Sequence, residues 1–491
     1  MNTARISTQR SSDKQLYAVI GGLGAVAGTD ILHRVVKSTP AQSDSEHLDI
    51  EFVQHPFFED ITPADPDYDP THRKFYVYNM LRYMEAQGRN IALLPCFVAQ
   101  IFLHEITPEV SVQVLGIMDA IKAHLTANTW EGRIGILTST YVRNSGYFEK
   151  SLGENFHVVY PGEEKQHLLM DAVYGAGGIK SGGSQSNIEE KIKTVCLDMV
   201  AKDCDLILPG FTDIPATMER IASEIPVHIL NSNQIYADFA VSFAAQQKKP
   251  PFKIGVVGGV GPAATTDFMS KIISKTSATR DQDHIKMLVE QNPQIPDRTE
   301  NILGEGDDPT LALYSCAKKL EQGGANIVAI PCNTAHAYVD RIQRHLNIPI
   351  INMLTETVDH IQQQFPNVRK IGLLATTGTV KSNLYQTAAE RAGLCVVVPD
   401  NDIQTLVMAS IYGENGVKAG YSSGLCKEQL LTAYEHLEEK GAEVIILGCT
   451  ELPLIAPGIK DNLRPAELDP TAILAGKCVR IADQFKRNVR S

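Results

Sequence analysis

The stretch Ala329-Ile-Pro-Cys-Asn-Thr-Ala-His336 ends an apolar run that begins at Ala325, and Ile446-Leu-Gly-Cys-Thr-Glu-Leu-Pro453 ends a second such run. This pattern is typical of a buried parallel strand that delivers side chains at its carboxyl end, where open α/β sheets place their ligands. We therefore expect Cys332 and Cys449 to project from strand ends, each beside a helix N-terminus that favours a thiolate. The alternative interpretation is that the two cysteines are unrelated and simply buried in the core. The matched contexts favour two thiols that face one another across a cleft and act as acid and base.

The chain is one module written twice. The offset between matching motifs stays between 236 and 238 residues over nearly 200 positions, and chance does not hold an offset so steady. The matching segments are Val19–Gly24 with Val256–Gly261, Leu94–Cys96 with Ile330–Cys332, Gly135–Leu137 with Gly372–Leu374, Tyr174–Gly175 with Tyr412–Gly413, Gly178–Lys180 with Gly416–Lys418, and Gly210–Pro215 with Gly448–Pro453.

The repeat sets the expected domain boundaries. Residues 1–14 are polar and rich in Ser, Arg and Gln, and we expect them to form a disordered leader. A first module then spans residues 15–246 and a second spans residues 252–491. The polar, proline-ended segment Gln246–Pro251 is the expected linker between them.

Strand and helix patterns alternate within each module, which predicts an α/β fold with parallel sheets covered by helices. The pattern restarts at Lys370 after Pro366-Asn367, so each module is expected to contain two parallel-sheet lobes with a cleft between them. In the second module the predicted strands are Lys253–Val257, Lys286–Glu290, Ile327–Ile330, Ile350–Asn352, Ile371–Leu374, Val396–Val398 and Glu443–Leu447. The predicted helices include Asp308–Glu321, Thr334–His345, Ser382–Ala392 and Lys427–Lys440.

The composition of the chain argues against nucleic-acid-binding, secreted and membrane proteins. The 491 residues are 43% hydrophobic and 21% charged, and a net charge of −12 argues against nucleic acid as the main partner. Nine cysteines without a CxxC motif are typical of reduced cytosolic thiols. No signal-peptide core and no uninterrupted apolar span is present in the sequence. We therefore expect a soluble, cytoplasmic protein that does not bind membranes.

The glycine-rich turn Gly258-Gly-Val-Gly-Pro262 ends the first strand of the second module and opens a helix. It lacks the helix glycine of a GxGxxG motif, and no acidic residue clearly ends a second strand about 20 residues later, so a nucleotide site is disfavoured. Backbone N–H groups such as that of Gly259, approaching a substrate carboxylate, fit better. A turn without any ligand is the alternative.

Residues 252–485 resemble the aspartate/glutamate racemase family, which consists of PLP-independent enzymes with two catalytic cysteines. The matching motifs, in order, are Gly258–Pro262, Asp283-His284, Asn292-Pro-Gln-Ile-Pro-Asp-Arg-Thr299, Pro331–His336, Ala375-Thr-Thr-Gly-Thr379 with Lys381, and Gly448–Pro453. The resemblance implies an active site between two lobes, with Cys332 and Cys449 on opposite faces of the substrate α-carbon. It also implies Arg298 and Lys381 as binders of substrate carboxylates, no cofactor, a small amino-acid substrate, and frequent dimerisation.

Racemisation also requires hydrogen-bond donors that stabilise the substrate carbanion. A proton leaves one face of a weak carbon acid and returns to the other, and without an electron sink, preorganised donors must stabilise charge on the α-carboxylate. Asn333, Thr334 and Thr450 adjoin the cysteines and are candidate donors, and Gly259 and Thr376 are further substrate-binding candidates within the family motifs. His336 and Glu451 are candidates to assist the thiols, with a capping or surface histidine as the alternative for His336. Arg298 offers a planar fork for a carboxylate, and Lys381 is expected to open a helix. We expect no metal ligands.

The first module departs from the motif at its functional positions. Pro95-Cys96 is retained, but Phe97-Val-Ala-Gln100 replaces the polar Asn-Thr-Ala-His, and Phe211 stands at the position of the second cysteine. No arginine clearly aligns with the one of the second module, and Arg143 lies within one residue of the position of Lys381. We predict a degenerate copy that keeps the fold without two-thiol chemistry. It stands in for the dimer partner of the family, so the chain is a monomeric pseudo-dimer or a homo-oligomer.

The sequence therefore predicts an amino-acid racemase in the second module, acting on aspartate or glutamate, which differ by one methylene group. A cysteine-dependent decarboxylase or isomerase of small dicarboxylates is one alternative, although that chemistry can need only one proton-donating cysteine. A ligand-binding or regulatory protein descended from a racemase is the other alternative, and the degenerate first module keeps it open.

Overall fold

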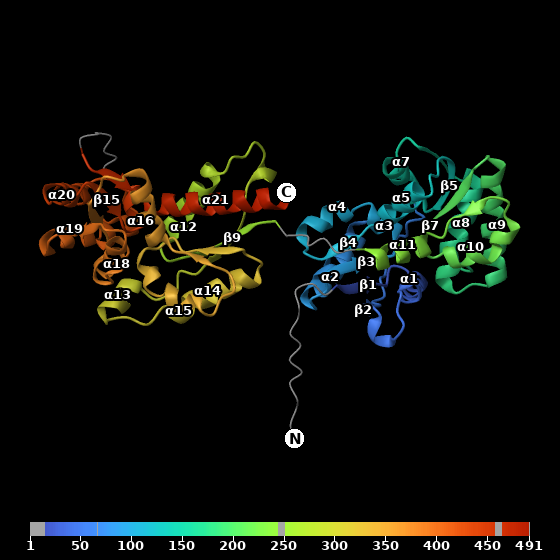
Figure 1. Ribbon diagram of the computed structural model, residues 1–491, viewed down its shortest axis with the longest axis horizontal. Coiled ribbons are helices and arrows are strands. Elements are labelled where there is room, and N and C mark those ends of the chain that lie inside the picture. Colours follow the sequence, from blue (N-terminus) through green and yellow to red (C-terminus); the bar gives the residue numbers. More distant parts are fainter. Residues whose placement is uncertain (1–14, 66, 244–250, 457–463, 491) are drawn as a thin grey trace, which may run out of the picture. The chain divides into compact units, whose positions relative to one another are not determined.

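The computed structural model describes residues 15–65, 67–243, 251–456 and 464–490 (Figure 1). The chain divides into two compact units, Met1–Pro250 and Pro251–Ser491. The expected leader at residues 1–14 and residues 246–250 of the expected linker lie outside the described residues. In the part of the chain that is described, no helix combines the length and the apolar character needed to cross a membrane.

The second unit contains two four-stranded sheets in which every strand pair is parallel. Its first sheet has the order β10-β9-β11-β12, formed by β9 (Lys253–Gly258), β10 (Lys286–Gln291), β11 (Ile327–Ala329) and β12 (Ile350–Ile351). In the central strand β9, Val256 lies opposite Val289 on one side and Ala329 on the other. The second sheet has the order β14-β13-β15-β16, formed by β13 (Lys370–Leu374), β14 (Cys395–Val397), β15 (Val444–Leu447) and β16 (Ala466–Leu468).

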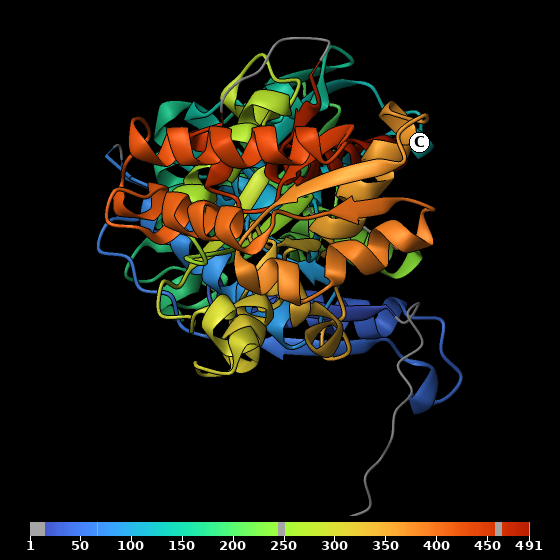
Figure 2. The ribbon, with the colours of Figure 1, turned by 90° about the vertical axis from the view of Figure 1, so that its left-hand side faces the viewer.

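Helices cover both sheets of this unit, which Figure 2 brings to the front. Burial explains the arrangement, because the central strands β9 and β15 carry Ile, Val and Leu side chains and are buried along nearly their whole length. The longer helices are α12 (Pro262–Lys275), α14 (Thr310–Gln322), α16 (Met353–Gln364), α18 (Leu384–Arg391), α19 (Asn401–Tyr412), α20 (Leu425–Glu439) and α21 (Pro470–Arg490). The shorter helices are α13 (Arg298–Leu303), α15 (Val339–Gln343) and α17 (Thr377–Lys381).

The first unit repeats this architecture with sheets of order β2-β1-β3-β4 and β6-β5-β7-β8, again all parallel. Its strands are β1 (Leu16–Ile20), β2 (Asp49–Val53), β3 (Ile91–Leu93), β4 (Gln113–Leu115), β5 (Gly132–Thr138), β6 (Phe156–Val159), β7 (Leu206–Gly210) and β8 (His228–Ile229). Its helices are α1 (Ala25–Ser38), α2 (Thr71–Ala86), α3 (Phe97–Gln100), α4 (Leu103–Ile106), α5 (Ile117–Ala127), α6 (Thr140–Asn144), α7 (Tyr147–Leu152), α8 (Glu163–Tyr174), α9 (Gln185–Ala201), α10 (Pro215–Ile221) and α11 (Ser232–Ser242). The α/β class, with two parallel-sheet lobes in each of two modules, is confirmed.

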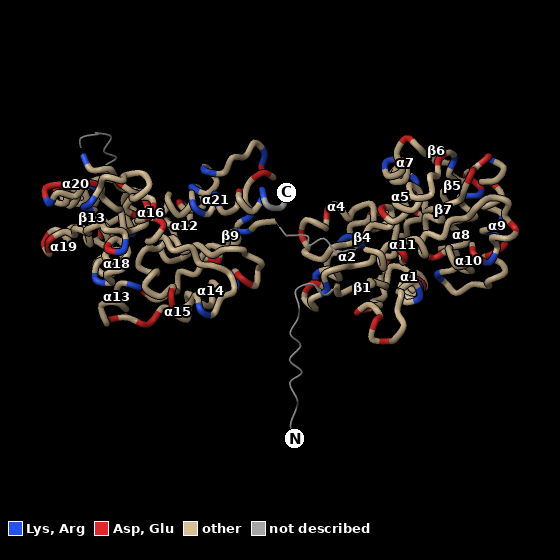
Figure 3. The backbone as a smooth tube through the Cα atoms, in the orientation of Figure 1, with Lys and Arg blue, Asp and Glu red and all other residues tan. Residues whose placement is uncertain are grey.

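Charged residues are scattered over both units, with Lys and Arg interspersed among Asp and Glu (Figure 3). Along the described chain, the charged residues are therefore spread out rather than gathered in one segment.

Two local predictions are wrong. The predicted helix Thr334–His345 is interrupted, because a 3-10 turn at Thr334–Ala337 precedes α15. Lys381 does not open a helix but is the last residue of α17, and the next helix, α18, begins at Leu384 after a left-handed residue at Asn383. A left-handed residue cannot continue a right-handed helix, so the predicted helix from Ser382 starts two residues late.

Candidate active site

Both cysteines of the second unit line one small pocket, with a cavity volume of about 20 Å³. Cys332 follows β11 of the first sheet, Cys449 follows β15 of the second, and each is 7% exposed. The pocket therefore collects side chains from the carboxyl ends of strands in both lobes, as expected for parallel sheets. Its other lining residues are Val260, Arg298, Thr299, Asn333, Thr334, Thr376, Tyr412, Lys418, Gly448, Thr450 and Glu451.

The expected α-helix N-termini beside the cysteines are not formed. Cys332 precedes the 3-10 turn Thr334–Ala337, and Cys449 precedes a second 3-10 turn at Leu452–Leu454. A single turn aligns few peptide dipoles, so the helix macrodipole contributes little at either sulfur. Side-chain charges set the electrostatics of this pocket instead.

Arg298 brings an unpaired cation into the pocket. The Asp297 side chain caps α13 by accepting hydrogen bonds from the backbone N–H groups of Thr299 and Glu300, at 2.8 and 3.0 Å, so Arg298 begins the helix. Its Nη1 donates to the backbone carbonyls of Ile295 and Pro296, at 3.3 and 3.1 Å. The residue is 8% exposed, and within the described residues its Nε has no hydrogen-bond partner. Burial lowers the pKa of Arg298, but Cys332 and Asp297 outweigh it and raise the pKa overall.

Asn333 presents a second unpaired donor. Its Oδ1 accepts a hydrogen bond from the Tyr385 hydroxyl at 2.7 Å, which fixes which end of the amide is the acceptor. Its Nδ2 is buried and has no partner in the part of the chain that is described. A buried donor without a partner costs free energy, about 1–3 kcal/mol, unless a ligand completes it.

Four threonine hydroxyls join three segments at the pocket wall. Thr299 contacts Thr376 at 3.2 Å, Thr334 contacts Thr376 at 3.3 Å, and Thr379 contacts Thr334 at 2.7 Å. Thr376 also caps α17 by accepting from the backbone N–H of Thr379. Gly378 permits this approach, because a Cβ there would lie 2.8 Å from the Cα of Thr299. The cluster fixes the Arg298 loop against both lobes of the unit.

Glu451 organises the side of the pocket around Cys449. Its carboxylate accepts a hydrogen bond from the Cys449 thiol at 3.1 Å and from Lys418 Nζ at 2.9 Å. Burial, reinforced by the negative charge of Glu451, raises the pKa of Cys449 well above its ordinary value. Burial opposes the charge on Lys418, but Glu451 and Cys449 raise its pKa overall. Cys449 therefore rests as a neutral thiol beside a closed ion pair.

The glycine-rich turn makes room for this carboxylate. Gly261 has φ = +114°, and a Cβ there would lie 2.3 Å from Oε1 of Glu451. Gly259 has φ = +88°, and a Cβ there would lie 2.2 Å from the carbonyl carbon of Asn292. The backbone N–H of Gly259 donates to the Thr265 hydroxyl at 3.2 Å, and Gly259 is not among the residues that line the pocket. The turn therefore shapes the site, but the expectation that Gly259 offers its N–H to a substrate is wrong.

His336 connects two backbone segments rather than assisting a thiol. Its Nε2 accepts a hydrogen bond from the backbone N–H of Met353 at 3.1 Å, so Nδ1 carries the proton and donates to the Cys332 carbonyl at 2.9 Å. Burial lowers the pKa of the imidazole and keeps it neutral. Gln100, at the matching position of the first unit, makes the same kind of link between the Ile117 N–H and the Leu94 carbonyl. The capping alternative fits His336, whereas Glu451 does contact a catalytic candidate.

Lys381 is exposed and does not line the pocket, and the lysine that does is Lys418. Sequence reasoning did not select Lys418, although the internal repeat has a lysine at this position in both modules. Gly416-Val-Lys418 matches Gly178-Ile-Lys180 in the first module, and a lysine retained in both copies at a short glycine-containing turn was informative. Within the described residues, no cluster of three or more His, Cys, Asp or Glu side chains is arranged to hold a metal ion.

Comparison with known proteins identifies the family to which the chain belongs. The sequence pattern of the Asp/Glu/hydantoin racemase family matches residues 20–240 and again residues 257–478. The chain belongs to this family. The two separate matches agree with the internal repeat and identify the chain as a tandem duplication of one family module.

Individual relatives match about one module. The broad specificity amino-acid racemase RacX of Bacillus subtilis (strain 168) is 29% identical over 232 residues, which cover 46% of this chain and 96% of RacX. A glutamate racemase of Aquifex pyrophilus is 31% identical over 163 residues, which cover 32% of this chain and 60% of that enzyme. Among solved structures, the Picrophilus torridus aspartate racemase has 29% identity and a TM-score of 0.41, covering 47% of this chain and 94% of that one.

Proposed function

We propose that the second unit is a cofactor-independent amino-acid racemase that interconverts the L and D forms of aspartate or glutamate. The observation that carries the proposal is a single pocket that holds two thiols together with two buried donors, Arg298 Nε and Asn333 Nδ2, that lack partners within the described residues. Family membership supports a racemase, and the charges of the pocket support an acidic substrate.

Charge balance is the argument for the acidic side chain. Lys418 is already paired with Glu451, whereas Arg298 forms no ion pair in the described part of the unit. Arg298 is therefore the cation of this pocket that no carboxylate holds, and the side-chain carboxylate of aspartate or glutamate can supply that partner. Arg298 binds the side-chain carboxylate, because a guanidinium fork suits that group.

The α-carboxylate must lie close to the reacting carbon, so donors adjacent to the cysteines suit it best. Asn333 directly follows Cys332, and Thr450 directly follows Cys449. When the α-proton leaves, negative charge spreads onto this carboxylate, and donors already in place stabilise it without reorganising. Asn333 Nδ2 and the hydroxyls of Thr334 and Thr376 are the proposed donors, whereas the Thr450 hydroxyl already donates to Oε2 of Glu451 at 3.2 Å.

Two thiols complete the reaction with protons in balance. One cysteine, as a thiolate, takes the α-proton and becomes a thiol, and the electron pair of the C–H bond passes to the substrate. The other cysteine, as a thiol, returns a proton to the opposite face and becomes a thiolate. The resting state suits this division, because Cys449 is a thiol bonded to Glu451, whereas Cys332 lies beside the positive charge of Arg298. The next turnover in the opposite direction reverses the two roles.

Incubation of the purified chain with each enantiomer of aspartate and glutamate in D2O tests the proposal, with Cα deuterium followed by NMR. We expect deuterium in both enantiomers of one or both acids. A decarboxylase or isomerase of a dicarboxylate would instead leave amino acids unlabelled. That alternative needs only one proton-donating thiol, so the retention of both cysteines in one pocket argues against it.

A further inference from the structure

The first unit retains a pocket at the position that matches the proposed active site. Its cavity volume is about 20 Å³, the same as in the second unit. The pocket is lined in part by Cys96, Phe97 and Phe211. Two phenylalanines have therefore replaced smaller residues, and the cavity is no smaller than its counterpart in the second unit.

The polar residues have been replaced in matched pairs. Phe97 packs against Phe148 with ring centroids 5.6 Å apart. These are the positions at which Asn333 and Tyr385 form a hydrogen bond in the second unit. In the same way, Val98 and Val142 stand where Thr334 and Thr379 share a hydrogen bond. Each exchange removes both partners, so no buried polar group is left unpaired.

The ion pair of the site is retained. Lys180 Nζ lies 3.3 Å from Oδ2 of Asp213, at the positions that match Lys418 and Glu451. Lys180 also donates to the Leu23 carbonyl at 3.2 Å and lies over the Tyr174 ring, 5.6 Å from its centroid. A second hollow, with a volume of about 380 Å³, shares Lys180 and Asp213, so the pair is reachable from outside the small pocket.

An arginine reaches the remaining cysteine by a different route. Arg73 on α2 donates from Nη1 to Cys96 Sγ at 3.3 Å, although it does not match Arg298 in the sequence repeat. Unlike Arg298, it is paired with a carboxylate, because its Nε and Nη2 donate to the two oxygens of Glu59. Arg73 is 4% exposed, and the Tyr68 hydroxyl donates to the same carboxylate at 2.6 Å. The two cations of this pocket are therefore balanced by two carboxylates.

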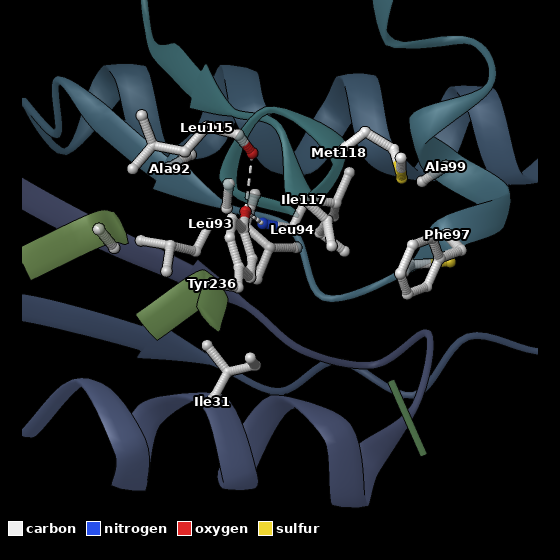
Figure 4. Close-up of a cluster of buried hydrophobic side chains, with 14 of the residues drawn as sticks. Ile31, Ala92, Leu93, Leu94, Phe97, Ala99, Leu115, Ile117, Met118 and Tyr236 are labelled. Carbon is white, nitrogen blue, oxygen red and sulfur yellow. Dashed lines mark hydrogen bonds between the residues drawn. The ribbon is translucent and has the colours of Figure 1, made fainter. Parts of the chain in front are cut away.

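The frame around Cys96 is fixed from the opposite side. Tyr236 on α11 is fully buried, donates to the Leu115 carbonyl at 2.7 Å and accepts from the backbone N–H of Leu94 at 3.0 Å (Figure 4). These bonds hold the end of β3 two residues before the cysteine, within an apolar cluster that includes Phe97 and Met118. A pocket held in this way is preorganised for a ligand.

We propose that the first unit binds a free α-amino acid with an uncharged, apolar side chain and does not racemise it. Such a zwitterion has no net charge, which matches the balanced pocket, whereas aspartate or glutamate brings a negative charge for which the described pocket has no spare cation. The remaining N–H groups of Arg73 and Lys180 bind the carboxylate, and Asp213 binds the ammonium group. The ligand side chain packs against Phe97 and Phe211. Phe211 cannot return a proton, so the bound amino acid keeps its configuration.

Trp130 provides a readout confined to the first unit, because it is the only tryptophan of the chain. Thermal melting of the full chain, followed by tryptophan fluorescence, reports ligands that stabilise this unit. We expect L- or D-leucine or methionine to raise the midpoint by about 5–10 °C at a hundredfold excess over Kd. Aspartate and glutamate should leave it unchanged. A rise with the acidic amino acids alone, or no rise with any neutral one up to about 10 mM, overturns the proposal.

Matched variants assign the response to the pocket. Lys180→Met should weaken the binding of leucine or methionine about tenfold or more, whereas Lys418→Met, the matching change in the second unit, should leave the fluorescence response unaltered. Loss of the fluorescence response in Lys418→Met but not in Lys180→Met would contradict the proposal.

Glu59→Gln releases Arg73 from its carboxylate and should shift the ligand preference of the first unit toward aspartate and glutamate. A pocket that is merely damaged loses all ligands and does not exchange one class for another, so an unchanged preference in this variant also counts against the proposal. The test is independent of the proposed racemase, because it measures no turnover.

Discussion

The thiol of Cys449 donates a hydrogen bond to Oε2 of Glu451 over 3.1 Å, and both side chains are almost fully buried. This contact couples the protonation of one proposed catalytic group to a carboxylate. It also distinguishes Cys449 from Cys332, which lies beside Arg298.

Replacement of Glu451 by glutamine should make Cys449 more reactive. Burial and the charge of Glu451 raise the pKa of Cys449, so little thiolate is present at neutral pH and the fraction grows as pH rises through the raised pKa. Glutamine removes the negative charge but leaves Lys418, so the profile of Cys449 alkylation by iodoacetamide should move to lower pH. Peptide mass spectrometry over a pH series measures this shift. Cys332, equally exposed at 7%, is the internal control, and an unmoved Cys449 profile would contradict the proposed coupling.

Replacement of Arg298 by alanine should weaken acidic substrates selectively. The loss of a charge-assisted contact costs about 1.5–3 kcal/mol, or about tenfold or more in kcat/KM. Steady-state kinetics on aspartate and glutamate measure this loss, and thermal melting checks that the unit still folds. Unchanged kinetics in a folded variant would show that the substrate carboxylate is bound elsewhere.

The two candidate lysines form a matched pair for mutagenesis. Lys418→Met breaks the ion pair with the buried Glu451 and should lower kcat/KM at least about tenfold, because it leaves a carboxylate unpaired beside Cys449. Lys381 is exposed and outside the pocket, so Lys381→Met should retain activity. If loss of activity followed Lys381 instead, the sequence-based choice would be right and the pocket geometry misread.

A glutamine in place of His336 should be tolerated, because Gln100 bridges the same elements in the first unit. His336→Ala should destabilise the chain by about 1–3 kcal/mol, since the Met353 N–H and the Cys332 carbonyl both lose a buried partner. Chemical denaturation and racemase assays of the two variants separate the roles. A stable but inactive glutamine variant would mean that the imidazole takes part in proton transfer.

The sequence predicted the fold and the position of the two cysteines after strand ends, because both depend on local patterns. Aliphatic runs of strand length identify parallel strands, and Cys332 and Cys449 are found where such runs end. The repeat allowed each module to support the reading of the other. Arg298, Asn333 and Thr376 line the same pocket, and sequence could select them because they stand in family motifs or beside the cysteines.

The parts that sequence could not predict depend on contacts between distant segments. Arg73 reaches Cys96 from another helix, so no alignment at the repeat offset finds it as a counterpart of Arg298. Lys418 and Glu451 are 33 residues apart, and their pairing depends on how two separate 3-10 turns meet in space. His336 was ambiguous because spacing alone does not tell which atoms its two nitrogens contact.

The single-thiol variants test the central claim most directly. In D2O, the unmodified chain is expected to place deuterium at Cα in both enantiomers of an acidic amino acid and to interconvert them. Cys332→Ala and Cys449→Ala should each abolish interconversion, with α-proton exchange surviving in at most one enantiomer, and a different one in each variant. Substantial racemisation by either folded single variant, measured by chiral chromatography, would contradict the two-thiol account.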